Sequence, residues 1–307
     1  MENLTMQTEF ILLGLSSDPQ VENLLCFVFL LIYATTLFAN FAILLLIRNE
    51  PSLHTPMFFF LGHLALIDVC YSSVTVPKML GNFFAKKKSI SVDACIVQIS
   101  SFLHFVCVEG YLLSAMAYDR YVAICHPLHY STMMKKQRCR QLVCVAWMMG
   151  FLNALLNTVP LMDLTFCGSN LIHHYTCTLP AVLSLSCSEH FISHVLMLFT
   201  ATFFGSTSFL LTLVSYIYII SNILKMQFAK SRRKAFSTCS SHLIVVCMFY
   251  LSIFIEHLKP RISSTTDLDR VASIQYLILT PLLNPIIYSL KNNDIKASLW
   301  KRSRRFR

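Results

Sequence analysis

The chain has 307 residues, of which 55% are hydrophobic and only 13% are charged, and its formal net charge at pH 7 is +10. This composition is typical of helices that lie in a lipid bilayer, and it excludes an ordinary water-soluble domain. A positive charge of this size can indicate nucleic acid binding, but here the basic residues flank apolar segments. We therefore expect membrane lipid and a cytoplasmic protein as partners, and no nucleic acid.

Seven apolar segments are long enough to cross the hydrocarbon core of a membrane, which takes roughly 20 residues of helix. In chain order they cover residues 24–47, 57–81, 95–118, 139–160, 192–224, 235–258 and 271–290. They predict an all-α membrane protein built as a seven-transmembrane helix bundle. The expected parts are an N-terminal tail over residues 1–23, the transmembrane domain over residues 24–290, and a short amphipathic C-terminal helix with a tail over residues 291–307.

Lys and Arg residues gather on one side of the predicted membrane. The first 23 residues and the long loop 161–191 contain none, whereas the loops after spans one, three and five and the C-terminus contain most of them. The N-terminus is therefore expected to be extracellular and the C-terminus cytoplasmic. On this topology the sequon Asn3-Leu4-Thr5 faces the side where glycans are added, so we expect Asn3 to be glycosylated.

Four cysteines lie on the predicted outer side: Cys95, Cys167, Cys177 and Cys187. Because that side is oxidising, they are expected to form two disulfides, and three pairings are possible from the sequence. An alternative is a metal site made by residues of the same loop: His173, His174, Cys177 and His190. Cysteines consumed in disulfides cannot bind metal, and the spacing matches no common zinc pattern, so we expect no such site.

Two acidic residues lie within the predicted spans, Asp68 in the second and Glu109 in the third. An ionised carboxylate in hydrocarbon is costly and persists only when it is paired, protonated or bound to a cation. One interpretation is that both are protonated and hydrogen-bonded to Asn40, Asn284 or a water molecule.

Two motifs indicate a conformational switch. Asp119-Arg120-Tyr121 lies where the third span ends and a basic loop begins, and an acid–base pair at a membrane edge can form in one state and separate in another. In the seventh span, Pro285 removes a backbone donor between Asn284 and Tyr288. A kink is expected there, beside polar groups suited to rearrangement.

Together these motifs resemble the signatures of odorant receptors of the tetrapod type, a family within the rhodopsin-like (class A) G-protein-coupled receptors. Four further segments match in the expected order: 53–61, 77–80, 215–216 and 234–243. The resemblance covers nearly the whole chain. Four residues depart from the family pattern. Ala39 and Leu251 stand where the family usually has Gly, Phe58 stands where it has Tyr, and Thr178 stands where it has Asp.

The resemblance implies the disulfides Cys95–Cys177 and Cys167–Cys187. It also implies that Asp68 and Glu109 hold a sodium ion or a proton as an allosteric brake, with no other metal or cofactor. The switch residues it implies are Asp119, Arg120, Tyr121, Tyr216, Asn284, Pro285 and Tyr288.

The implied function is binding of a small, volatile odorant within the helix bundle. This activates a stimulatory G protein of the olfactory type, which raises cyclic AMP at the plasma membrane, and trafficking chaperones are expected partners. Helical spacing and the family's pocket region select these ligand residues: Leu103, Val106, Cys107, Gly110, Thr200, Phe204, Tyr250, Ile253, His257, Ile274 and Leu277.

Several other functions are disfavoured. An amine receptor needs a carboxylate where Phe102 stands, and a retinal protein needs a lysine within 271–290, which has none. A transporter or channel needs an inverted repeat or a polar path through several spans. An enzyme is not expected, because no nucleophile–base pair lies in the spans. A related rhodopsin-like receptor, or an odorant receptor for a metabolite outside the nose, remains an alternative.

Overall fold

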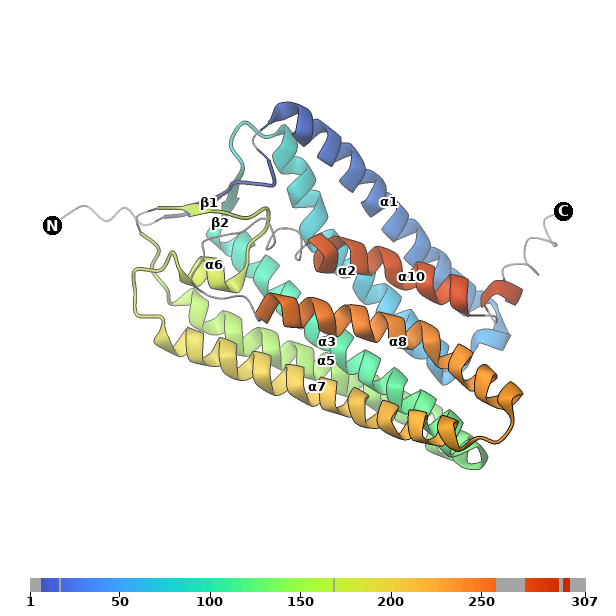
Figure 1. Cartoon of the computed structure of the whole chain (residues 1–307). Coiled ribbons are helices and arrows are strands. Elements are labelled where there is room, and N and C mark those ends of the chain that lie inside the picture. The colour runs from blue at the N-terminus through green and yellow to red at the C-terminus, as the bar shows by residue number, and fades with distance from the viewer. Residues whose placement is uncertain (1–6, 17, 168, 258–273, 293–294, 299–307) are drawn as a thin grey trace.

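The computed structural model describes residues 7–16, 18–167, 169–257, 274–292 and 295–298, and Figure 1 shows long helices packed into one bundle. The long helices are α1 (Pro19–Asn49), α2 (Pro56–Phe84), α3 (Val92–Cys125), α5 (Lys136–Met162), α7 (Phe191–Lys225), α8 (Ala229–His257) and α10 (Thr280–Lys291). Shorter elements connect them: the 3-10 turns Pro51–Leu53 and Pro127–His129, the helices α4 (Tyr130–Met133) and α6 (Leu179–Leu183), and the π-helical turn Gln275–Leu279.

Helices α1, α2, α3, α5 and α7 are each long and apolar enough to span a bilayer. Helix α8 qualifies as a sixth span when its segments Ala229–Ser237 and Cys239–Ile255, bent by 43°, are taken together, and Leu277–Ser289 is a shorter apolar helix. The first six predicted spans coincide with α1, α2, α3, α5, α7 and α8, the seventh coincides with the π-helical turn together with α10, and the predicted seven-helix bundle is confirmed. The outer ends of the last two predicted spans, at residues 258 and 271–273, lie outside the described residues.

Local sequence signals explain where two of these helices begin. Before α1, the Asp18 side chain accepts a hydrogen bond of 2.9 Å from the Gln20 N–H, and Pro19 occupies the first helical position. Before α3, the Ser91 hydroxyl accepts a hydrogen bond of 3.3 Å from the Ala94 N–H. Both caps satisfy N–H groups that have no partner within their own helix.

Large apolar side chains cover the outside of the bundle. Phe38 is 77% exposed, Met148 66% and Leu224 67%. In a bilayer these side chains contact lipid, and each helix satisfies its own backbone hydrogen bonds, as a spanning segment must.

Helix α3 packs against α2, α5, α7 and α8, so it lies at the centre of the bundle. Its contact with α5 depends on Gly150, where an added Cβ would lie only 2.7 Å from the carbonyl oxygen of His104. Small residues permit such close approach of two helices in a membrane. The glycine therefore sets how closely α5 approaches the helix that carries Glu109 and Arg120.

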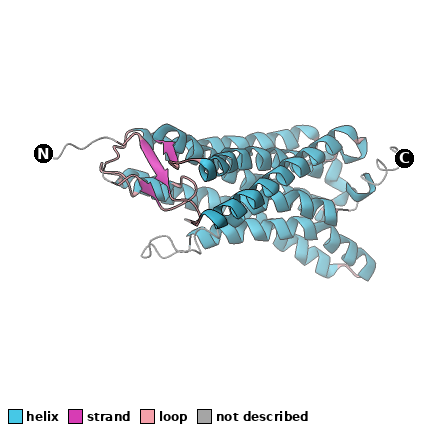
Figure 2. Cartoon of the chain, turned by 90° about the horizontal axis from the view of Figure 1, so that it is seen from above, coloured by secondary structure: helices cyan, strands magenta, loops and turns pink. Residues whose placement is uncertain are grey.

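A three-stranded sheet covers one end of the bundle, as Figure 2 shows. Strand β1 (Glu9–Leu12) lies in the centre, antiparallel to β2 (Ser89–Ser91) and parallel to β3 (Leu171–Ile172). Phe10 is fully buried, and its ring packs edge-on against Phe166 at a centroid distance of 5.2 Å. Lys87 forms a 2.8 Å ion pair with Glu9 and lowers the pKa of that exposed carboxyl. The segment expected to be a simple tail thus joins two outer loops.

The C-terminal part of the bundle has two irregular features. Pro285 lies inside α10, but the departure from α-helical bonding comes earlier, in the π-helical turn Gln275–Leu279. Beyond α10, residues 295–298 are helical, and the Ile295 N–H donates to the Asn292 side chain at 3.4 Å. Ile295 is 1% exposed and packs against the bundle core. The rest of the expected amphipathic helix lies outside the described residues.

Candidate ligand pocket and switch

The Asp119–Arg120 pair is closed in this structure. Arg120 donates to Asp119 Oδ2 from Nη2 at 2.8 Å and from Nε at 3.2 Å, and the Tyr130 hydroxyl donates to Asp119 Oδ1 at 2.8 Å. Asp119 is fully buried, so both its oxygens use these donors in place of water. Burial, and next the charge of Asp119, raise the pKa of Tyr130, which keeps its hydroxyl protonated as a donor.

A second hydrogen-bonded group links α3, α7 and α8. The Tyr216 hydroxyl donates to His242 Nδ1 at 2.6 Å, and His242 Nε2 donates to the carbonyl oxygen of Leu113 at 3.1 Å. His242 is fully buried, so these two bonds replace the water that its ring nitrogens would otherwise contact. The Tyr216 and His242 rings are stacked with centroids 5.8 Å apart.

Two other predicted switch residues, Tyr121 and Tyr288, form no hydrogen bond with these groups among the described residues. Tyr121 pairs its hydroxyl with His126 Nε2 at 3.0 Å, and its ring lies 5.7 Å from that of Tyr218 on α7. Tyr288 on α10 is fully buried, and its hydroxyl has no hydrogen-bond partner among the described residues. A buried hydroxyl without a partner is costly, so Tyr288 gains a bond if the bundle rearranges toward one.

The two membrane acids meet at one amide. Asn284 Nδ2 donates to both oxygens of Asp68 at 3.2 Å and to Glu109 Oε1 at 3.4 Å. Asn40 lies close in the fold but donates instead to the carbonyl oxygens of Pro281 and Thr36, each at 3.0 Å. Of the two amide partners expected for the acids, the structure therefore provides Asn284 alone.

The chemistry of this site fits a small hard cation. Asp68 is 2% exposed and Glu109 5%, and the side-chain oxygens of Asn284 and Asn40 have no hydrogen-bond partner among the described residues. Oxygen atoms of carboxylates and amides are the ligands that such cations take. Two ionised carboxylates this close repel each other, so either a proton or a cation is needed to neutralise the pair.

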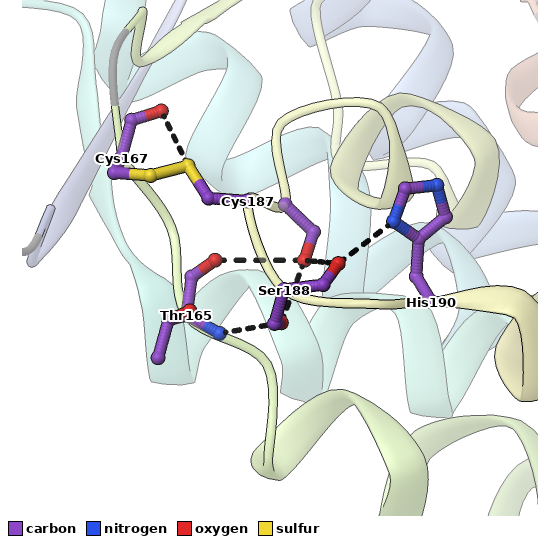
Figure 3. The surroundings of a disulfide bond; sticks show 6 residues. Thr165, Cys167, Cys187, Ser188 and His190 are labelled. Carbon is purple, nitrogen blue, oxygen red and sulfur yellow. Dashed lines mark hydrogen bonds between the residues drawn. A yellow bond between two sulfur atoms is a disulfide. The ribbon is translucent and has the colours of Figure 1, made fainter.

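The outer cysteines are paired as the family resemblance implies. Cys95 is bonded to Cys177 with their Cα atoms 5.6 Å apart, and Cys167 to Cys187 at 5.9 Å, the latter shown in Figure 3. Gln98 supports the first bridge, because its Oε1 accepts a 2.9 Å hydrogen bond from the Cys177 N–H.

The four-residue metal site weighed for this loop does not form. Cys177 is held in its disulfide, and His174 is buried with its ring stacked on Tyr175. Across the described part of the chain, no group of three or more His, Cys, Asp or Glu side chains is placed to hold a metal ion.

Most of the predicted ligand residues belong to the main apolar cluster of the bundle or pack against it. The main apolar cluster contains or contacts seven of them: Val106, Cys107, Phe204, Tyr250, Ile253, Ile274 and Leu277. Gly110 lies beside them, where an added Cβ would be 3.4 Å from Phe249. Leu103 packs instead against the outer cluster below the sheet. The Thr200 hydroxyl oxygen accepts a 2.9 Å hydrogen bond from Asn157 Nδ2 of α5. The side chain of His257 lies outside the described part of the structure.

Three hydroxyls form a polar patch beside this apolar cluster, and we call it the hydroxyl cluster: Ser114, Thr212 and Tyr250. The Ser114 hydroxyl lies 3.0 Å from that of Thr212, which lies 3.5 Å from that of Tyr250. All three are buried. The sequence analysis identified only Tyr250, although Gly110 and Ser114 share one face of a helix through their spacing of four.

Comparisons with known proteins indicate the family and the fold of the chain. Residues 25–303 match the family model described as "Olfactory receptor". The mouse protein Olfactory receptor 5M5 is 46% identical over 303 residues, covering 99% of this chain and 95% of the relative. The human protein Olfactory receptor 5AR1 is 42% identical over 300 residues, covering 98% and 97%. The crystal structure of squid rhodopsin shares the fold at a TM-score of 0.73 and 18% identity, covering 93% of this chain and 86% of that one.

Proposed function

Because the chain belongs to the olfactory receptor family, we propose that it binds a small organic odorant among α3, α7 and α8 and activates a stimulatory G protein that raises cyclic AMP. The family consists of multi-pass receptors of the plasma membrane that act without enzymatic chemistry.

The observation that carries the proposal is the position of two side chains on one helix. Tyr250 belongs to the apolar cluster and the hydroxyl cluster, whereas His242 holds Tyr216 on the inner side, eight residues or about 12 Å along α8. A ligand that displaces the Tyr250 side chain thereby moves the helix that carries His242. The ligand shifts the equilibrium only by its differential affinity for the two arrangements.

The proposed active arrangement differs from this structure in two bonds that break and two contacts that form. Arg120 leaves Asp119, Tyr216 leaves His242, and Tyr216 and Tyr288 approach Arg120 as the inner end of α8 moves outward. The basic inner loops then receive the G protein. In the arrangement described here those bonds are closed, which supports its identification as the resting state.

The surroundings indicate the chemistry of the ligand. Phe204, Ile253 and Leu277 provide apolar contact, and the hydroxyl cluster provides hydrogen-bonding groups at one point. We therefore propose an odorant with an apolar body and one oxygen function, such as an alcohol or carbonyl.

The acid pair is proposed as a brake on activation. A sodium ion or a proton shared by Asp68 and Glu109 favours the packing of α10 against α2 and α3, because Asn284 contacts both acids. Loss of the ion or proton, or rotation of Asn284, releases α10.

A cyclic AMP assay in cells tests the proposed function. The receptor is co-expressed with odorant-receptor chaperones and challenged with a chemically broad odorant panel, with Arg120→Ala as the signalling control and Tyr250→Phe as the ligand control. A dose-dependent rise that Arg120→Ala abolishes at equal surface display supports the proposal. A response of equal size in Arg120→Ala contradicts the proposed switch.

A further inference from the structure

Two histidines lie side by side at the outer end of α7. His190 is the residue immediately before the helix, and His194 lies in the first turn of the helix. Their ring centroids are 5.0 Å apart, and the rings are inclined by 58°. Both side chains are partly exposed, with Nδ1 of His194 buried.

A hydrogen bond fixes the tautomer of His190. Its Nδ1 donates to the carbonyl oxygen of Ser188 at 3.0 Å, as Figure 3 shows, so Nε2 carries the lone pair. Histidines that bind metals characteristically donate their other ring N–H to a carbonyl or carboxylate in this way. The second ring nitrogen of His190 is thus prepared to act as a ligand.

The ring separation matches a shared metal ion. Zinc binds imidazole nitrogen at about 2.0–2.1 Å in tetrahedral geometry, which places the centroids of two bound rings about 5 Å apart. An i, i+4 pair of histidines on a helix is a recognised arrangement for binding one zinc ion.

A disulfide and a hydrogen bond hold the segment before His190, which favours binding because little order has to be created. The Cys167–Cys187 disulfide anchors the chain three residues earlier. The Ser188 hydroxyl accepts a 3.1 Å hydrogen bond from the Thr165 N–H, and Figure 3 shows both constraints beside His190. The backbone carbonyl that orients the imidazole is therefore itself held in place.

We propose that His190 and His194 form an extracellular binding site for a divalent transition-metal ion of the zinc class. The protein supplies two ligands and solvent supplies the others, so the ion exchanges and acts as a modulator rather than as a structural centre. The neighbouring Glu189 contributes negative charge beside the ion.

The ion acts on the ligand region through α7. At 3.6 residues per turn, His190 and His194 begin the stripe that continues through residues 197, 201, 204 and 208, and it includes the buried Phe204 of the apolar cluster. A bound ion ties the second outer loop to the first turn of α7 and resists its displacement. It therefore changes how readily a ligand reaches the apolar cluster around Phe204.

Binding is measured directly on the full-length receptor, purified in detergent without odorant or G protein, so the result does not depend on the proposed function. Zinc chloride is titrated while the thermal unfolding midpoint and the competition with a chromogenic zinc indicator are recorded. Saturable binding of one ion should weaken at least tenfold in His190→Gln and in His194→Gln. His173→Gln, a change to an exposed histidine of the same loop, should leave binding unchanged.

The proposal is overturned if zinc neither raises the midpoint nor competes with the indicator, or if both variants bind as the unchanged receptor does. A variant that fails to fold is recognised by its lost surface display. The double variant His190→Asn with His194→Asn then gives a second test, in which only the competition with the zinc indicator is measured. If this variant still binds one zinc ion per receptor, the proposed site is wrong.

Discussion

The Tyr216 hydroxyl donates a 2.6 Å hydrogen bond to His242 Nδ1, and this contact joins α7 to α8 on the inner side of the bundle. We predict that His242→Phe raises basal cyclic AMP, because it removes the acceptor while keeping a ring against Tyr216. The unpaired buried hydroxyl costs about 1–3 kcal/mol in the resting state, enough to increase the active population several-fold. Basal signalling at matched surface density is the measurement.

Tyr216→Phe is the matched control for that experiment. It removes the same bond but also the hydroxyl that is proposed to approach Arg120 in the active arrangement. Basal signalling should therefore stay low, and the maximal odorant response should fall. An increase in basal signalling equal to that of His242→Phe would contradict the active role given to Tyr216.

Tyr130 restrains Asp119 from outside α3. We predict that Tyr130→Phe increases basal signalling, because one oxygen of the buried carboxylate loses its donor and the closed Asp119–Arg120 pair is weakened by about 1–3 kcal/mol. The raised pKa of Tyr130 keeps the hydroxyl protonated, so the difference from the unchanged receptor should not vary with pH in the range used for cell assays. If Tyr130→Phe and the unchanged receptor have the same basal activity at each pH, Tyr130 has no part in the resting state.

The spans and the two switch motifs follow from the sequence because each depends on residues close together in the chain. Hydropathy defines a span within about 20 residues, and Asp119 and Arg120 are adjacent. The family resemblance then supplied what no local pattern holds, including the pairing of cysteines 82 residues apart.

The features that were missed depend on contacts between distant segments. Strand β1 pairs Glu9 with Ser91 and Ile11 with Leu171, and nothing in four tail residues identifies these partners. His242 follows Ser240 and Ser241 in the sequence, and nothing distinguishes it from these polar neighbours until Tyr216 and Leu113 are placed beside it. The pair of His190 with His194 had a local signal, the spacing of four, but the sequence analysis associated His190 with Cys177 instead.

Sodium should stabilise the resting state through the acid pair. We predict that replacing choline chloride with sodium chloride at constant ionic strength raises the thermal midpoint of the purified receptor, since an ion that binds only the folded state stabilises it by mass action. Asp68→Asn should abolish this dependence, because it removes a carboxylate charge beside Asn284.

Glu109→Gln discriminates between the two occupants of the acid site. With a shared proton, the variant keeps the neutral state of the pair and should have a midpoint close to that of the unchanged receptor in choline chloride. With a bound sodium ion, it should lose the sodium-dependent increase as Asp68→Asn does. A sodium-dependent increase that survives in both variants would place the ion elsewhere.

The close packing of α5 against α3 can be tested by substituting glycines. This packing positions the helix that carries Glu109 of the acid pair and Arg120 of the switch. Gly150→Ala should reduce the stability of the receptor by about 1–3 kcal/mol, because the new Cβ would meet the carbonyl oxygen of His104 at 2.7 Å and backbone cannot move aside cheaply. Gly205→Ala is the matched control, since nothing lies within 4 Å of the Cβ added there and alanine favours a helix. The thermal midpoint of each purified variant and its surface display should both fall for Gly150→Ala and hold or rise for Gly205→Ala. Equal behaviour of the two variants would mean that α5 can move away from α3 without cost.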